Sequence, residues 1–465
     1  MLEDFEVHNQ FRESVVRYRN HDPHLKKLTL APLVYYSTLL QEKNFNLPGI
    51  FVITGGRQVG KTTFLKQLIL RLLEQKKVSP ESILFLSGEL IDSHHKLRLI
   101  INQFSEQMQK HLYLFVDEVN YIPDWDKSLK FLADSGTFEY MSIFLTGSDT
   151  SIIKAAMKRF PGRRGAASVV DYSYNPLSFT EFVCLKDKKL YAACHDIIEK
   201  PLLSTVSEYE KYHGRLLVLL NEYLIHGGYL PAITEFEKHK VISRSVTNTY
   251  IQWIVGDMLK HNKDEHYVWE ILRGIKKTYL NGISWNTLGK SLSIEHHKTV
   301  ADYCYLLESA HVIHIQEMLV EHKLVGGPKK NRKIYFRDPF IDHAVTVHLN
   351  PSVTTTDIQK KLSDNLFLSS YIEAIIVDHC KRRFPTYYIR GNKGEVDVAV
   401  VIGDEFFPIE VKWTNTMRSE ELKQIQQYKK GIILSKGAEQ KKMGNNTIIP
   451  LLRFLLYIDH GVFEY

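Results

Sequence analysis

Between residues 50 and 173, short apolar runs alternate with stretches of helical periodicity. The runs are Ile50–Thr54, Ile83–Leu86, Leu112–Val116, Ser142–Thr146 and Val169–Tyr172. Strands of a parallel sheet are buried on both faces, so they appear as unbroken apolar runs separated by crossover helices. The pattern predicts a domain over residues 49–180 with a parallel sheet and helices on both faces. Residues 1–48 are polar, and we expect this N-terminal extension to be helical in part.

Helical periodicity dominates residues 181–265, which show few strand signals. The segment 227–231, Gly-Gly-Tyr-Leu-Pro, predicts a break between two helices, because glycine and proline disfavour a continuous helix. We expect residues 181–265 to form an all-helical lid.

Three helices followed by two strands are predicted over residues 266–348. The helices are His266–Tyr279, Trp285–Leu292 and Glu295–Ser309, and the strands are Val312–Met318 and Lys333–Phe336. This order predicts a winged helix-turn-helix, and basic residues near the start of its third helix and on its hairpin suit phosphate contacts. These residues are His296, His297, Lys298, Lys329, Lys330, Arg332 and Lys333. Asp302 and Glu308 dilute the charge of the helix, so contact with a protein remains an alternative.

The Thr- and Ser-rich segment 349–363 is predicted to be a linker, and residues 364–465 to form a C-terminal α/β domain. The predicted helices of this domain are Leu366–Arg382 and Ser419–Lys429, and its predicted strands are Thr386–Arg390, Val396–Ile402, Phe406–Val411 and Gly431–Leu434.

A glycine-rich segment lies between the first predicted strand and a predicted helix, Thr62–Leu73. Its residues fit G-x-x-x-x-G-K-[ST] and are Gly55, Gly56, Arg57, Gln58, Val59, Gly60, Lys61 and Thr62, followed by Thr63. Glycines let backbone N–H groups turn toward phosphate oxygens, and a helix N-terminus favours negative charge. Lys61 can reach the β- and γ-phosphates, and the Thr62 hydroxyl can bind Mg²⁺. The segment therefore predicts a phosphate-binding loop for ATP with Mg²⁺.

Polar residues at the ends of two later strands support this prediction. Asp117 and Glu118 follow an apolar run, where Asp117 would hold Mg²⁺ through water and Glu118 would orient or activate the attacking water. Ser148 follows the run Ser142–Thr146, at a position suited to sensing the γ-phosphate.

Two adjacent arginines, Arg163 and Arg164, lie between Gly162 and Gly165. An arginine supplied across a subunit boundary accelerates phosphoryl transfer by about 10³–10⁵. A solvated basic loop has the same spacing, so the residues alone leave both interpretations open.

The segments GGRQVGKTT, LFVDEVNYIPDWDKSLKFLAD, FLTGSDTSII, FPGRRG and YNPLSFTEF occur in this order. Together they resemble the archaeal and bacterial DEXX-box ATPases of the AAA+-like group that carry a C-terminal domain of the DUF4143 type, over roughly residues 20–465. The resemblance implies Arg163 as the better arginine-finger candidate, and a homo-oligomer such as a hexameric ring. It also implies structural roles for Trp125 and for the Pro-Leu-Ser-Phe segment 176–179.

Three polar residues interrupt the apolar strands of the C-terminal domain. Twelve residues separate Asp397 from Glu410, and Glu410 and Lys412 are two apart, so they face the same side of a strand. Two carboxylates can bind Mg²⁺ or Mn²⁺, which activates water, and Lys412 can position the nucleophile or neutralise developing charge. The alternative is an exposed acid on each strand with a lysine that reaches to solvent.

This spacing resembles the PD-(D/E)XK nuclease pattern. The resemblance implies Glu373, on the preceding predicted helix, as a further metal ligand. Glu395 could compete with Asp397 as a ligand, but we expect it on the opposite face of a regular strand.

The composition limits which partners and which cellular compartment we expect for this protein. The net charge of +7 permits a nucleic-acid partner without requiring one. The N-terminus is charged, and no apolar run approaches the ~20 residues that span a bilayer, so we expect a cytoplasmic protein with no membrane partner. Four scattered cysteines without C-x-x-C spacing indicate buried thiols in a reducing compartment.

We therefore expect an α/β multidomain protein: a P-loop AAA+-like ATPase with a helical lid, a winged helix and a PD-(D/E)XK-like domain. The expected function is ATP hydrolysis coupled to DNA binding and metal-dependent DNA cleavage. The alternative is a regulatory or signalling ATPase whose C-terminal domain binds nucleic acid or protein without cutting.

Overall fold

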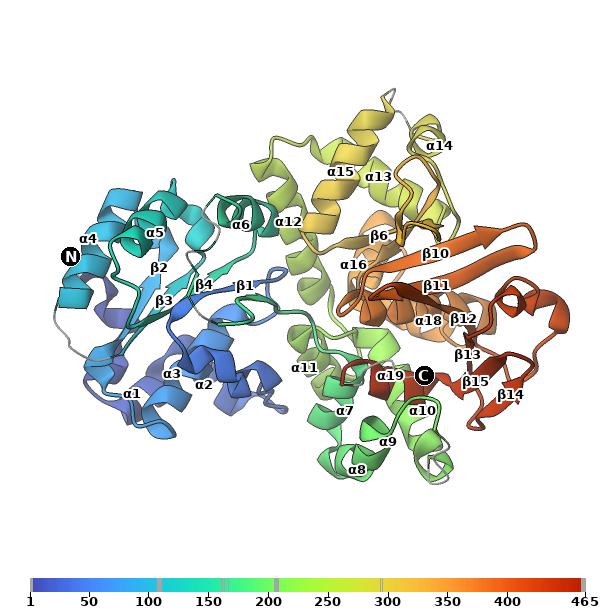
Figure 1. Ribbon diagram of the computed structural model, residues 1–465, viewed down its shortest axis with the longest axis horizontal. Helices are drawn as coiled ribbons and strands as arrows, with labels where there is room; N and C mark the ends of the chain where they lie inside the picture. The colour runs from blue at the N-terminus through green and yellow to red at the C-terminus, as the bar shows by residue number, and fades with distance from the viewer. Residues whose placement is uncertain are drawn as a thin grey trace. The chain divides into compact units, whose positions relative to one another are not determined.

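The computed structural model describes residues 3–106, 111–159, 162, 164–165, 167–204, 209–292, 294 and 296–460, without the side chains of residues 196 and 419. The chain divides into two compact units, Met1–Asn175 and Pro176–Tyr465. In Figure 1 the first unit runs from blue to teal and the second from green to red. The finer boundaries expected for the lid, the winged helix and the C-terminal domain stay predictions.

The first unit is built on a five-stranded sheet with the order β2-β3-β4-β1-β5. Its strands are β1 (Gly49–Thr54), β2 (Ile83–Ser87), β3 (Leu112–Asp117), β4 (Met141–Gly147) and β5 (Asp171–Ser173). All neighbouring strands are parallel, which confirms the predicted sheet. The fifth strand starts two residues later than its apolar run.

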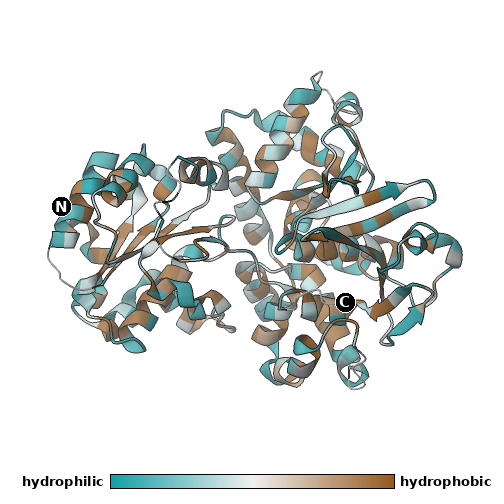
Figure 2. Ribbon diagram, in the orientation of Figure 1, coloured by the Kyte–Doolittle hydropathy of each residue, from teal (hydrophilic) through white to brown (hydrophobic). Residues whose placement is uncertain are grey.

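The two faces of this sheet are covered by different side chains. Its helices are α3 (Lys61–Glu74), α4 (His94–Glu106), α5 (Trp125–Asp134) and α6 (Thr150–Met157). Aliphatic strand residues pack against α4, α5 and α6. On the other face, the ring centroid of Phe144 lies 5.2 Å from that of Phe51 and 4.8 Å from that of Phe115. Figure 1 shows α4 and α5 on one side of the sheet and α3 with α2 (Pro23–Leu30) on the other, and Figure 2 shows hydrophobic residues along the central strands.

The N-terminal segment is helical in part, as expected, and packs onto the same unit. It contains α1 (Val15–His21), α2 (Pro23–Leu30) and short 3₁₀ turns. The Lys66 ammonium of α3 lies 3.3 Å from the Asp22 carboxylate and 3.7 Å from the ring centroid of Phe85. This buried ion pair anchors the start of α2 to the helix that follows the glycine-rich loop.

The second unit begins with helices. They are α7 (Phe179–Lys186), α8 (Lys188–Ala193), α9 (His195–Glu199), α10 (Glu210–His226), α11 (Leu230–His239) and α12 (Arg244–Lys260). The predicted break lies between α10 and α11, where Gly227 has φ 59° and Gly228 N–H donates to Asp338 Oδ2 at 2.8 Å. In the described part of the chain no single helix has the length and apolar character to cross a membrane, and only α10 with α11, bent by 111°, passes such a test as a pair.

Three helices and a hairpin follow, as expected for residues 266–348. They are α13 (Glu265–Lys277), α14 (Trp285–Lys290), α15 (His297–Ser309), β6 (Ile313–Glu317) and β9 (Arg332–Phe336). Glu295, the expected first residue of the third helix, lies outside the described residues. Strands β6 and β9 pair antiparallel, and a smaller hairpin, β7 (Leu319–Val320) with β8 (Val325–Gly326), lies between them in sequence. Helix α16 (Pro339–Leu349) completes this part.

The expected linker, residues 349–363, differs from its prediction because it contains a helix, α17 (Thr355–Lys361). Thr354 and Asp357 form a capping box at its start, and Ile358 is buried. Thr is common in linkers but is also a favourable N-cap residue, so the prediction from composition alone was wrong for this segment.

The C-terminal domain has a six-stranded sheet with the order β10-β11-β12-β13-β15-β14. Its elements are α18 (Asn365–Lys381), β10 (Thr386–Gly391), β11 (Gly394–Ile402), β12 (Glu405–Lys412), β13 (Gly431–Ser435), β14 (Lys441–Met443), β15 (Asn446–Pro450) and α19 (Leu451–Ile458). The predicted helix Ser419–Lys429 is wrong, because two 3₁₀ turns, Ser419–Leu422 and Ile425–Gln427, occupy this range. Leu422 ends the first turn and Ile425 begins the second, and both side chains are buried in the core of this sheet.

Candidate functional sites

The glycine-rich loop lies at the carboxyl end of β1 and leads into α3. Gly60 caps α3 with φ 103°, a conformation that favours glycine. A Cβ on Gly55 would lie 2.1 Å from the carbonyl oxygen of Tyr174, so only glycine fits beside that backbone. Lys61 is buried, and its Nζ donates to the carbonyl oxygens of Gly55 and Gly56, both at 2.8 Å. The loop therefore holds the lysine over the backbone that would surround a phosphate.

Two oxygen donors meet at the start of α3 and the end of β3. The Thr62 hydroxyl donates to Asp117 Oδ2 at 2.7 Å, and Asp117 is buried. Hydroxyl and carboxylate oxygens are ligands that Mg²⁺ prefers. Because the two side chains already converge, the residues fit the ion that sequence analysis assigned to them.

Glu118 adopts a left-handed backbone conformation, with φ 51° and ψ 50°. Its carboxylate accepts hydrogen bonds from the Ser148 backbone N–H at 3.1 Å and the Ser148 hydroxyl at 3.0 Å. Such a conformation is uncommon for a residue with a side chain and frequently marks a functional position. The structure thus brings together the acid and the serine that sequence analysis placed after separate strands.

Sequence analysis missed Thr146, the β4 residue that links the two acids. Its hydroxyl donates to Asp117 Oδ1, and it accepts from the Glu118 backbone N–H at 3.1 Å. The position of this threonine, at the end of an apolar run and directly before Gly147 and Ser148, could have identified it from the sequence.

The structure describes only one of the two arginines in the segment 162–165. Arg163 lies outside the described residues. The Arg164 guanidinium donates to Asp171 Oδ2 at 2.7 Å and to the carbonyl oxygens of Ile50 and Val170 at 3.2 and 2.9 Å. Arg164 therefore holds β1 to the segment before β5, and a role at another subunit would require these contacts to break.

A carboxylate cluster, which we define as Glu373, Glu395, Asp397 and Glu410, lies on the C-terminal sheet and α18. Val398 pairs with Ile409, so Asp397 of β11 and Glu410 of β12 lie at the next positions of the two strands. The Val411 N–H donates to Asp397 Oδ2 at 2.8 Å, and Lys412 Nζ lies 2.8 Å from Glu410 Oε1. Glu410 and Lys412 therefore share one face, as their spacing predicts.

The expectation for Glu395 was wrong. Lys333 Nζ forms an ion pair with Glu395 Oε1 and lies 3.9 Å from Asp397 Oδ1, so both acids face the same lysine. Residues two apart on a strand point the same way, and Glu395 precedes Asp397 by two. The same Nζ lies 3.0 Å from Glu373 Oε1, which brings α18 into the cluster.

Burial of the cluster raises the pKa of two of its acids. The pKa of Glu373 is raised to about 7 and that of Glu410 to about 8, first by burial and next by the nearby charge of Asp397. Within the described ranges, no group of three or more His, Cys, Asp or Glu side chains is arranged to hold a metal ion. Glu373, Asp397 and Glu410 therefore do not fit a metal ion in this arrangement, because lysines already lie among them.

The basic residues expected on the hairpin surface divide into two pairs. Lys329 and Lys330 are exposed, but Arg332 and Lys333 are buried, which corrects the expectation for the latter two. The Arg332 guanidinium lies 4.3 Å from the ring centroid of Trp285, and Lys333 enters the carboxylate cluster. His296, His297 and Lys298 are exposed at the start of α15, as expected.

The parallel sheet, the glycine-rich loop and the acidic end of β3 define a P-loop ATPase. Residues 48–183 match the family model of an AAA domain, and two further segments match domains of unknown function, DUF8612 over residues 217–352 and DUF4143 over residues 368–454. The AAA-domain and DUF4143 matches support the AAA+-like, DUF4143-type ATPase family that the sequence motifs indicated.

Two relatives align with most of this chain at low identity. An uncharacterized protein of Haemophilus influenzae is 22% identical over 448 residues, covering 93% of this chain and 100% of that protein. An uncharacterized protein of Methanocaldococcus jannaschii is 24% identical over 431 residues, covering 88% of this chain and 85% of that protein.

Similar solved structures include the Walker-type ATPase of Pyrococcus abyssi, with a TM-score of 0.42, 12% identity, and coverage of 66% of this chain and 93% of that chain. The Aeropyrum pernix Orc1 protein in complex with DNA has a TM-score of 0.31, 13% identity, and coverage of 72% of this chain and 94% of that chain.

Proposed function

We propose that this chain is a Mg²⁺-dependent ATPase that hydrolyses ATP at the P-loop and acts on DNA through its second unit. The observation that carries the proposal is the convergence of Thr62, Asp117 and Glu118 beside the loop that holds Lys61. These are the groups needed to bind phosphate, hold the ion and direct water.

Each side chain has a separate part in the proposed reaction. Lys61 would exchange its two carbonyl contacts for the β- and γ-phosphate oxygens. Thr62 and Asp117 would hold Mg²⁺, which supplies charge neutralisation at those phosphates. Glu118 would orient the attacking water, and Ser148, which donates to that carboxylate, would report the presence of the γ-phosphate.

Substitutions at these positions test the ATPase proposal. Lys61→Ala should weaken nucleotide binding, whereas Glu118→Gln should keep binding and lose turnover by about 10²–10⁴-fold, because the group that directs water is gone. Binding of a fluorescent ATP analogue and phosphate release measure the two effects. The matched control, Glu139→Gln, changes an exposed acid of the same unit and should keep wild-type turnover.

The DNA part of the proposal is supported by His296, His297 and Lys298 at the exposed start of α15 in a predicted winged helix, and by the exposed Lys329 and Lys330. The same phosphate-release assay tests it when duplex DNA is added. Turnover should rise with DNA, and the rise should fall as salt increases, because phosphate contacts weaken in salt. Wild-type turnover at Glu118→Gln would contradict the ATPase assignment, and turnover indifferent to DNA would contradict the DNA partner.

Metal-dependent DNA cleavage, with Mg²⁺ or Mn²⁺ at Glu373, Asp397 and Glu410 and with Lys412 beside them, requires a cluster that admits the ion. The described arrangement does not fit one, so we propose no cleavage step. Binding without cutting is the alternative that this geometry favours. A homo-oligomer, such as a ring that supplies Arg163 to a neighbouring site, remains part of the proposal for ATP hydrolysis.

A further inference from the structure

A pocket of about 590 Å³ opens at the end of α18, in the second unit. Its walls come from α15, β6, the residues that join α18 to β10, and the start of β10. Ile315 and Thr386 are buried in these walls, whereas Tyr305 is 50% exposed. None of the four acids of the carboxylate cluster lines this pocket. Its volume lies in the range of about 300–1,000 Å³ that is typical of sites for small organic ligands.

Aromatic and basic side chains line the pocket together. Tyr305, Phe384 and Tyr387 supply the aromatic rings, and Lys381 and Arg383 supply positive charges. The guanidinium carbon of Arg383 lies 5.4 Å from the ring centroid of Phe384. Sites for unpaired nucleotides combine these two kinds of group, because aromatic rings stack on the nucleobase and cations attract the phosphate backbone.

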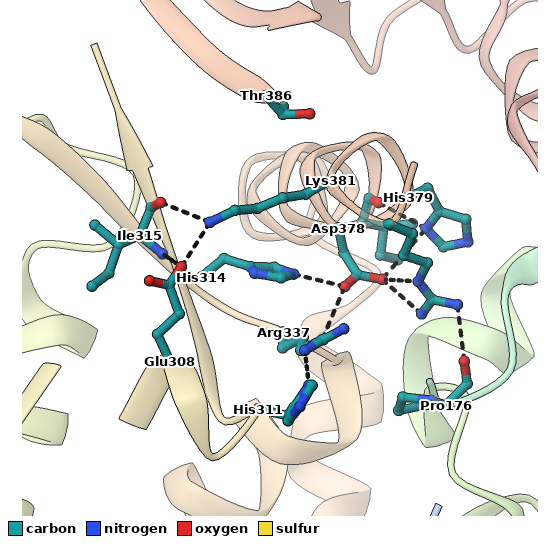
Figure 3. A network of polar contacts seen from close by, with 12 residues as sticks. Pro176, Glu308, His311, His314, Ile315, Arg337, Asp378, His379, Lys381 and Thr386 are labelled. Carbon is teal, nitrogen blue, oxygen red and sulfur yellow. Dashed lines mark hydrogen bonds and ion pairs between the residues drawn. The ribbon is translucent and has the colours of Figure 1, made fainter. Parts of the chain in front are cut away.

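The pocket also contains two carboxylates, those of Glu308 and Glu317. Glu308 is held in place, because its Oε1 lies 2.7 Å from Lys381 Nζ and accepts from the Ile315 N–H at 2.9 Å. Figure 3 shows Lys381 reaching from α18 to both of these residues. The side chains of Lys381 and Glu308 are 25% and 30% exposed. Carboxylates accept hydrogen bonds from nucleobase amino groups, which cytosine carries and thymine lacks.

A buried polar network fixes the walls of the pocket to one another (Figure 3). Asp378 of α18 accepts from His314 of β6 at 2.8 Å and from Arg382 Nε at 2.7 Å. The same carboxylate lies 3.6 Å from Arg337, directly after β9. The Lys381 ammonium, one turn further along α18, donates to the Ile315 carbonyl oxygen at 2.8 Å. The pocket is therefore formed before a ligand arrives, which reduces the entropic cost of binding.

Helix α15 connects this pocket to the basic residues proposed to contact DNA. Lys298 at its start and Tyr305 are seven residues apart, so they lie on the same face of the helix, about 10 Å apart along its axis. The Tyr305 ring is positioned by Trp285, with ring centroids 5.7 Å apart and planes at 72°. A DNA strand whose phosphates contact the start of α15 therefore has neighbouring nucleotides within reach of the pocket.

We propose that this pocket binds one unpaired nucleotide of the DNA strand that lies along α15. Tyr305 and Tyr387 stack on the nucleobase, and Glu308 or Glu317 accepts from its amino group. A paired base cannot enter, because it must first leave the helical stack. Because the two acids balance the two basic groups, the pocket suits a nucleobase better than an isolated phosphate ion. The site rests on the DNA partner proposed above and deepens it, since it specifies DNA with an unpaired base.

Binding of the full-length chain to two labelled duplexes, identical except for one unpaired cytosine, tests the pocket by fluorescence anisotropy. The wild type should bind the duplex with the unpaired cytosine about 10-fold or more tighter than the paired one, because stacking of one base on an aromatic ring contributes this much. Tyr305→Ala should lose the difference and keep the affinity for paired duplex. Tyr305→Phe keeps the ring and should keep the difference, as should Tyr140→Ala, the matched control at an exposed tyrosine of the first unit.

The identity of the unpaired base gives a second measurement, which does not depend on the folding of Tyr305→Ala. The wild type should bind an unpaired cytosine more tightly than an unpaired thymine by about 5-fold or more, since only cytosine offers an amino group to the carboxylates. Glu317→Gln should reduce this preference while keeping the gain from an unpaired base. If Tyr305→Ala and Glu317→Gln both behave like the wild type, the pocket does not bind the base.

The same measurements separate failure of the pocket from failure of the proposed function. Equal binding of paired and unpaired duplexes by the wild type overturns the pocket and leaves the DNA partner standing. Binding of neither duplex contradicts the DNA partner itself. Free deoxycytidine monophosphate, added in about 100-fold excess over the DNA, should not displace the duplex with the unpaired cytosine. Displacement would indicate a site for a free nucleotide and overturn the assignment to a DNA strand.

Discussion

Single buried side chains set part of the pH response of the second unit. His226, at the end of α10, packs its ring 4.7 Å from that of Phe182 and 5.5 Å from that of Phe236. Its Nδ1 lies 2.7 Å from the Gly227 carbonyl oxygen. Burial lowers the pKa of His226 to about 3, so the folded chain keeps this ring neutral while the unfolded chain protonates it near pH 6.5.

The lowered pKa of His226 determines in which direction stability changes with pH. Stability from His226 is fully present above pH 6.5 and is lost as pH falls from 6.5 toward 3, because the unfolded state binds the extra proton. Between pH 7.5 and 5.5, this one group should cost about 1 kcal/mol of unfolding free energy.

His226→Phe should remove this pH-dependent loss, although it also removes the contact with Gly227 and lowers stability at every pH. Urea unfolding followed by tryptophan fluorescence reports mainly on the second unit, which contains four of the five tryptophans. His239→Gln, an exposed histidine of α11, should keep the wild-type profile. If His226→Phe keeps the wild-type pH profile, protonation of His226 does not cause the loss of stability at low pH.

At the scale of elements, α17 shows how a short helix is specified inside a polar segment. The Thr354 hydroxyl accepts from the Asp357 N–H at 3.2 Å, and Asp357 Oδ2 accepts from the Thr354 N–H at 2.9 Å. The Thr355 hydroxyl donates to the Ile242 carbonyl oxygen at 2.9 Å, so the helix is also tied to the segment just before α12. Capping and one tertiary contact therefore order a segment that lacks a long apolar pattern.

Thr354→Ala should destabilise α17 by about 1 kcal/mol, because it removes the N-cap acceptor. Faster proteolysis and faster amide exchange within residues 349–363 measure this change. Thr354→Ser keeps the hydroxyl and should exchange like the wild type. Equal exchange in all three proteins would indicate that the capping box does not order this segment.

At the scale of the whole molecule, no arginine among the described residues is assigned as the finger of the P-loop site. Arg164 is engaged by Asp171 and by two backbone carbonyls, whereas the resemblance to the DEXX-box ATPases favours Arg163. A trans arginine requires an assembly in which one copy faces the P-loop of the next, as in a closed ring.

Mixing inactive subunits tests this assembly. Lys61→Ala and Arg163→Ala should each reduce turnover by about 10³-fold or more. In an equal mixture of the two, about one interface in four combines an intact loop with an intact arginine. The mixed ring should therefore recover about a quarter of the wild-type turnover. Mixing Lys61→Ala with Glu118→Gln is the control and should give no recovery, because both act within their own site. Absence of rescue in a demonstrated mixed oligomer would contradict the trans arginine.

Local sequence pattern alone determined much of the ATPase unit. Each apolar run of the first sheet is long enough to be buried, and the loop residues Gly55–Thr62 follow the first strand directly, so strand, loop and helix were predictable from neighbouring residues. The same holds for Asp117, Glu118 and Ser148, since carboxyl ends of parallel strands lie at one edge of a sheet. Their hydrogen bonds to one another, and the role of Thr146, depended on which strands became neighbours.

Only the tertiary structure decided how the charges of the second unit are used. Lys333 and Arg332 appear in sequence as surface bases of a hairpin, yet pairing of β9 with β6 and docking on β10 and β11 turn both inward. A buried ammonium needs anionic partners, and those partners, Glu373, Glu395 and Asp397, are at least 40 residues away along the chain. Sequence spacing records which residues share a strand face, but long-range packing decides which opposite charges meet. That difference is the physical reason why the P-loop was predictable and the burial of Lys333 among these acids was not.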